Sequence, residues 1–131
     1  MYRYYNPNPV GRSVGDCSVR AISKALGVDW EKAYAMIVVN GFRMGDVISS
    51  DTVWGSVLRM NGFNRLAIPS TCPDCFTIEE FCEYNPKGIF VLGTGGHVAT
   101  VVDGDLYDSW DSSGEVPIYV WYKGIQPRFR R

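Results

Sequence analysis

The chain has 131 residues, a formal net charge of −1 at pH 7, 46% apolar residues and 21% charged residues. The length suits one domain over residues 1–131, and the composition excludes collagen, coiled coils and disordered chains. The near-zero charge argues against a nucleic-acid partner, and no apolar run approaches the roughly 20 residues of a membrane-spanning helix.

The first segment, YRYYNPNPVGRSVG at 2–15, is aromatic and then rich in Asn, Pro and Gly. This composition predicts an extended arm with turns. The segment contains no apolar stretch of the kind found in secretory signals, so we expect a cytoplasmic protein. In that reducing compartment disulfides are rare, and we expect the four cysteines to be free thiols.

Three helices are predicted in the first half of the chain from their start and stop signals. Asp16 and Asp29 are candidate N-caps, and Gly27, Gly41 and Gly62 are the residues at which helices end. The predicted helices span residues 17–26, 30–40 and 51–61.

Strands dominate the second half of the chain. The segment Thr77-Ile-Glu-Glu matches a capping box and predicts one short helix that ends by Asn85. The predicted strands span residues 63–68, 88–92, 97–102, 106–110 and 117–123. Helices come first and antiparallel strands last, so the pattern predicts an α+β fold in which N-terminal helices pack on a C-terminal antiparallel β-sheet.

The dipeptide Asp103-Gly104 is a strong signal for a two-residue hairpin turn, and it sets the register of the strands around it. With these two residues as the loop, His97 lies opposite Trp110. Because side chains alternate between the faces of a strand, His97 shares a face with Asp108 and Trp110. Among the nearby aspartates, this parity selects Asp108 as the carboxylate that orients the imidazole.

Cys17 is expected in the first turn of a helix, where the helix dipole and free N–H groups stabilise a thiolate. His97 is the only histidine of the chain. Both residues also have structural interpretations, a small buried hydrophobe and a hydrogen-bonded core histidine. Arg20, one turn after Cys17, could hold a substrate carboxylate or keep the thiolate charged, or it could be a solvated helix residue or an ion-pair partner.

The order of a cysteine at a helix start, a histidine at a strand start and an aspartate on the next strand resembles the papain-like cysteine peptidases. Three local matches carry the resemblance. GDCS at 15–18 is similar to the nucleophile segment of NlpC-type and bacteriocin-processing peptidases, GHV at 96–98 to their histidine strand, and DSW at 108–110 to the Asn-Ser-Trp of papain.

The resemblance implies a papain-like fold and a thiol hydrolase that cleaves a peptide or peptide-like amide, with Cys17, His97 and Asp108 as its triad. It also implies that Trp110 shields the His–Asp pair from water. It implies no cofactor and no metal, and its partner is a peptide or protein substrate rather than a membrane or nucleic acid. The family's oxyanion-binding Gln is replaced by Gly11. We therefore name Asn8 as the second oxyanion donor beside the Cys17 N–H.

Two alternatives stay open. The missing Gln fits a papain-like module that binds without turnover. The cluster formed by CPDC at 72–75 and Cys82 fits a zinc site only if a fourth ligand is found, and it also fits a redox dithiol. We favour a structural turn with a helix-facing Cys82.

Overall fold

The computed structural model describes residues 1–130, and its elements confirm the α+β class. The helices of this part of the chain are α1 (Cys17–Leu26), α2 (Trp30–Met44), α3 (Asp51–Met60) and α4 (Ile78–Tyr84). The strands are β1 (Tyr2–Tyr4), β2 (Asn64–Ala67), β3 (Ile89–Gly93), β4 (Val98–Val102), β5 (Asp105–Asp108) and β6 (Tyr119–Tyr122). Every predicted helix and strand has a counterpart within a few residues.

The six strands form one sheet in the order β1-β5-β4-β3-β6-β2. All neighbours are antiparallel except β1, which runs parallel to β5 with Tyr2 opposite Leu106. The prediction of an antiparallel, C-terminal sheet was therefore wrong at this edge. The arm contributes a strand of only three residues, too short for an alternating pattern, and its partner lies at the other end of the sequence.

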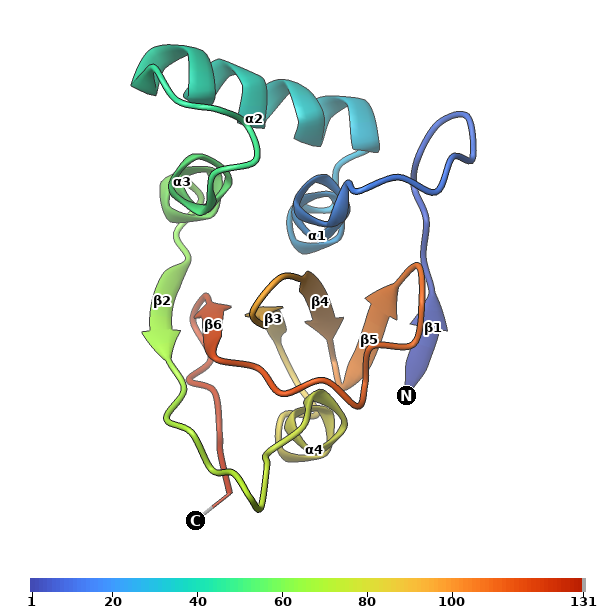
Figure 1. Cartoon of the computed structure of the whole chain (residues 1–131), viewed down its shortest axis with the longest axis vertical. Helices are drawn as coiled ribbons and strands as arrows, with labels where there is room; N and C mark the ends of the chain where they lie inside the picture. The colour runs from blue at the N-terminus through green and yellow to red at the C-terminus, as the bar shows by residue number, and fades with distance from the viewer. Residues whose placement is uncertain (131) are drawn as a thin grey trace.

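Helices cover both faces of the sheet (Figure 1). α1, α2 and α3 lie on one face, and their core includes Val91, Val98, Tyr119 and Trp121 of the sheet. α4 lies on the opposite face, where its Phe81 belongs to a second core with strand residues of the other parity. The prediction of helices on the sheet was incomplete, because strands with two apolar faces need a cover on each side.

The helix ends follow local signals with one exception. α1 ends at Gly27 as predicted, with φ +66°. α2 continues past Gly41 to Met44, with Gly45 as its C-cap. A Cβ on Gly41 would lie 3.1 Å from the carbonyl oxygen of Asp46. Gly41 thus permits a close approach of the following loop and does not end the helix. Within residues 1–130 no helix is long and apolar enough to cross a membrane.

The β4–β5 hairpin has the predicted loop and register. Asp103 and Gly104 have φ +48° and +80°, as a two-residue turn of this kind requires. Val102 pairs with Asp105 and Val101 with Leu106. Asp108 is the last residue of β5, so the turn determines where its carboxylate lies.

Candidate active site

Three side chains from separate elements meet beside the N-terminus of α1. Cys17 is the first residue of α1 and is half-buried. His97 directly precedes β4 and is 13% exposed, and Asp108 at the end of β5 is fully buried. Nε2 of His97 lies 2.6 Å from Oδ2 of Asp108, and Cys17 is close enough to the His97 ring to raise its pKa.

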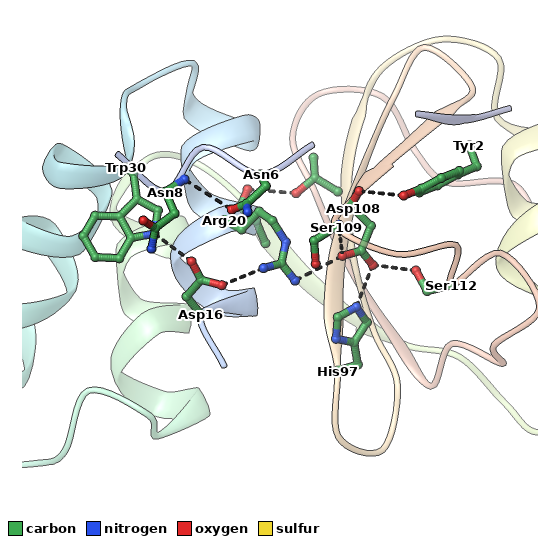
Figure 2. A network of polar contacts seen from close by, with 12 residues as sticks. Tyr2, Asn6, Asn8, Asp16, Arg20, Trp30, His97, Asp108, Ser109 and Ser112 are labelled. Atoms are coloured by element: carbon green, nitrogen blue, oxygen red, sulfur yellow. Dashed lines mark hydrogen bonds and ion pairs between the residues drawn. The ribbon is translucent and has the colours of Figure 1, made fainter. Parts of the chain in front are cut away.

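Asp108 is held by several donors besides His97 (Figure 2). The Ser112 hydroxyl donates to Oδ2 at 2.6 Å, and the Ser109 backbone N–H donates to Oδ1 at 2.7 Å. The prediction that Asp108 is the aspartate beside His97 is confirmed. The contact of Ser112 with Asp108 was not predicted. The sequence did contain a signal for it, because Ser112 is a hydroxyl residue only four positions after Asp108.

Trp110 lies against the His97 ring, as the hairpin register predicted. The ring centroids are 4.9 Å apart and the rings are inclined by 44°. Trp110 is 46% exposed, whereas His97 is 13% exposed. The more exposed indole therefore packs against the more buried imidazole.

The surroundings of Cys17 and His97 favour their charged forms. Burial disfavours the Cys17 thiolate, but hydrogen bonds with His97 and the Val98 backbone, and the charges of His97 and Arg20, outweigh burial and lower the pKa of Cys17. Burial also disfavours the imidazolium, but hydrogen bonds with Asp108 and Cys17 raise the pKa of His97 to about 9. Both directions favour the thiolate–imidazolium form of the pair over the neutral form.

Arg20 is a buried cation between two buried carboxylates (Figure 2). Its Nη1 lies 2.7 Å from Oδ1 of Asp16, and its Nη2 lies 3.1 Å from Oδ1 of Asp108. The other oxygen of Asp16 accepts from Nε1 of Trp30 at 2.8 Å. Arg20 therefore forms the ion pair considered for it, and its charge also favours the Cys17 thiolate, but its buried guanidinium is not free to hold a substrate carboxylate.

Asp16 occupies the N-cap position of α1, but its side chain makes no capping hydrogen bond. The prediction of a capping carboxylate was wrong because Arg20 and Trp30 take up both carboxylate oxygens. The first N–H groups of α1 consequently lack a side-chain acceptor. They are available to an oxygen atom bound next to Cys17.

A cavity of about 620 Å³ opens in front of Cys17 and His97. The cavity extends from the start of α1 and β4 toward α2 and α3. The lining comes from the arm, from α2 and α3, from the loop before β4, and from β6. It includes Asn8, Val14, Tyr34, Ile37, Ile48, Asp51, Trp54, Gly95 and Tyr119. Aromatic and aliphatic side chains make up much of this wall.

Asn8 lies in the wall of the cavity, as its proposed role requires. Its Oδ1 accepts hydrogen bonds from the backbone N–H groups of Val10 and Arg12, at 3.0 and 3.2 Å. This side chain therefore shapes the turn of the arm, and its Nδ2 is the group left to donate to a ligand.

The clustered cysteines divide into a bridge and a buried thiol. Cys72 and Cys75 form a disulfide across the Pro-Asp turn, with their Cα atoms 4.1 Å apart. The expectation of free thiols was wrong here because the turn brings both sulfurs together. Cys82 packs in the α4 core, and burial raises its pKa to about 11. Among residues 1–130 no three His, Cys, Asp or Glu side chains are grouped so that they could hold a metal.

No family model matches the chain, and neither a curated protein nor a solved structure is similar enough to count as a match. The functional conclusion therefore rests on the geometry of the Cys17 site.

Proposed function

We propose that the protein is a papain-like cysteine hydrolase that cleaves a peptide or peptide-like amide bond. One observation carries the proposal: the His97 ring is hydrogen-bonded to Asp108 at 2.6 Å and lines the same cavity as Cys17. A thiol nucleophile, a base within reach of it and a third group that orients the base are the parts that acyl transfer by a cysteine needs.

In the proposed reaction, the Cys17 thiolate attacks the amide carbonyl carbon, and a C–S bond forms as the carbonyl oxygen takes up negative charge. The His97 imidazolium gives its proton to the nitrogen of the leaving amine, the C–N bond breaks and a thioester remains on Cys17. Water then attacks the thioester while His97 accepts its proton. The C–S bond breaks, a carboxylic acid leaves and the thiolate–imidazolium pair is restored.

The carbonyl oxygen needs hydrogen-bond donors when it becomes negative. The Cys17 backbone N–H, at the uncapped start of α1, is one such donor in the proposal. Asn8 is the second, through Nδ2, because its Oδ1 is already bound by the arm. Loss of one oxyanion donor typically lowers the rate by about 100-fold to 1,000-fold.

Alkylation by iodoacetamide tests the proposed Cys17–His97 pair. The wild-type protein should be labelled rapidly at Cys17 at pH 7, because only the thiolate reacts. His97→Ala should slow this labelling at least ~10-fold, since it removes the hydrogen bond and the charge that lower the pKa of Cys17. Tyr122→Phe is the control, because Tyr122 lies outside the cavity lining. Equal labelling rates in the wild-type protein and His97→Ala would contradict the proposal.

A second candidate is a papain-like module that binds peptides without cleaving them. Gly11 in place of the oxyanion-binding Gln favours it. Incubation with a mixed peptide library, followed by mass spectrometry, separates the two functions. A hydrolase generates new peptide termini that Cys17→Ser abolishes. Rapid, His97-dependent alkylation with no new termini would support the binding module.

A further inference from the structure

Tyr119 lies in the wall of the Cys17 cavity with a hydroxyl group that no other residue uses. The side chain is 6% exposed, and its hydroxyl has no hydrogen-bond partner among residues 1–130. Within the same residues, Trp121 Nε1 is the one sealed side-chain polar atom without a partner. The Tyr119 hydroxyl is not one of the sealed atoms, and the Tyr119 side chain lines the cavity.

Gly93 makes this position of the ring possible. Gly93 of β3 pairs with Tyr119 of β6, and a Cβ on Gly93 would lie 1.9 Å from Cζ of Tyr119 and 2.3 Å from its hydroxyl oxygen. The phenol end of the ring therefore occupies the space that any other residue at position 93 would fill. It lies next to the 94–97 loop, which carries His97 and lines the same cavity.

The Tyr119 hydroxyl remains a hydrogen-bond donor at neutral pH. Burial and the nearby Asp51 carboxylate raise the pKa of Tyr119 to about 12, against the opposing charge of Arg65. The charge of Cys17 also raises the pKa of Tyr119, as expected for two residues that line the same cavity.

We propose that Tyr119 binds substrate, its hydroxyl donating a hydrogen bond to a carbonyl oxygen of the peptide that occupies the cavity. The neighbouring wall contributes Ile37 and Trp54, which offer a carbonyl oxygen little hydrogen bonding. A peptide carbonyl buried there without a partner would lose its hydrogen bonds to water at a substantial cost. The inference rests on the proposed hydrolase function and adds a substrate contact outside the triad.

The test compares a reagent that contacts only the thiolate with one that fills the cavity. The first is iodoacetamide and the second is N-acetyl-leucyl-glycyl chloromethyl ketone, both read at Cys17 by mass spectrometry. Tyr119→Phe removes only the hydroxyl. Iodoacetamide should react at an unchanged rate, whereas the second-order rate constant for the peptide reagent should fall ~10-fold, the effect of one hydrogen bond. In saturation kinetics the loss should appear in the inhibition constant.

Tyr122→Phe, on the same strand and outside the cavity lining, is the matched control and should leave both rates unchanged. Thermal melting checks the fold, and Tyr119→Phe should melt as the wild type does because its hydroxyl has no protein partner. An equal fall for both reagents, or none for the peptide reagent, overturns the inference. If instead His97→Ala matches the wild type with iodoacetamide, the proposed function itself fails, whatever Tyr119→Phe does.

Discussion

Arg20 and Asp108 lie 88 positions apart in the chain, and their buried ion pair joins the first helix to the fifth strand. The pair connects the segment that carries the nucleophile to the carboxylate that orients His97. Arg20 also holds Asp16, immediately before Cys17. One guanidinium thereby fixes the two halves of the candidate site relative to each other.

Arg20→Met should destabilise the protein strongly. It leaves the carboxylates of Asp16 and Asp108 buried without their cation, and breaking such a buried pair typically costs about 3–5 kcal/mol. Urea unfolding measures the loss. Arg3→Met is the control, because the Arg3–Asp105 pair is exposed and should contribute little. Equal midpoints for both variants would show that the Arg20 pair does not stabilise the fold.

Asp108→Asn should affect stability and reactivity together. The amide cannot balance the charges of Arg20 and His97, and we expect a loss of about 3 kcal/mol in the free energy of unfolding. Alkylation of Cys17 should also slow, because the His97 imidazolium loses its partner. Asp111→Asn is the matched control, since Asp111 is exposed and accepts a hydrogen bond from the Ser113 backbone N–H. A wild-type alkylation rate in Asp108→Asn would rule out its orienting role.

The His97–Asp108 pair should make stability fall as the pH rises. The pKa of His97 is about 9 in the folded protein, above its ordinary value of 6.5. The pair therefore contributes its full stabilisation below pH 6.5 and loses it as the pH rises through about 9. Cys17→Ser removes the thiolate, whose lowered pKa acts with the opposite sign. Cys17 also raises the pKa of His97, so in this variant the stabilisation is lost at a lower pH than in the wild-type protein.

The measurement is the free energy of unfolding of Cys17→Ser and of Cys17→Ser/His97→Gln across this pH range. The difference between the two variants should shrink as the pH rises. A difference that stays constant from pH 6 to pH 10 would mean that His97 is not charged in the fold.

Gly93→Ala tests the space that the Tyr119 ring occupies. The added Cβ would lie 1.9 Å from Cζ of Tyr119, and overpacking of this kind costs about 1–3 kcal/mol or more. Gly95→Ala, whose Cβ would meet nothing within 4 Å, is the control. Gly93→Ala should recover stability when combined with Tyr119→Ala, and an unchanged melting temperature of Gly93→Ala alone would contradict the packing described.

The four cysteines should react in a defined order. In the native protein Cys17 should be alkylated first, and Cys82 slowly, because burial raises its pKa to about 11. Cys72 and Cys75 should be labelled only after reduction, since they form a disulfide. Mass spectrometry counts the labels, with two in the denatured protein before reduction and four afterwards. Four labels without reduction would exclude the bridge.

Local signals predicted more of the site than of the layers around it. The Asp103-Gly104 turn fixes strand register within a few residues, so the neighbours of His97 followed by parity. Local sequence also predicted the N-cap position of Asp16, but it did not predict what the Asp16 side chain binds. The side chain at an N-cap position can bind the N–H groups of its own helix or a charged group elsewhere in the fold. Here the Asp16 carboxylate binds Arg20 and not the helix N–H groups.

Long-range placement was beyond reach of the sequence. The side on which α4 packs, the parallel pairing of β1 and the position of Tyr119 opposite Gly93 all depend on the order of strands in the sheet. The alternation of side chains along a strand indicates which residues of 117–123 share a face, but not which strand or helix they meet. The substrate contact inferred for Tyr119 could therefore come only from the three-dimensional arrangement.

Because Arg20 and Asp108 are far apart in the sequence, the alkylation rate of Cys17 should report when α1 joins the β4–β5 hairpin during folding. A refolding chain that has formed α1 but has not joined it to the β4–β5 hairpin carries an ordinary, slowly reacting thiol at Cys17. Contacts this distant in sequence close after local ones, because they carry a larger loop-closure entropy. Pulses of alkylating reagent during refolding would therefore time the joining of helix to sheet, separately from the helix signal in circular dichroism.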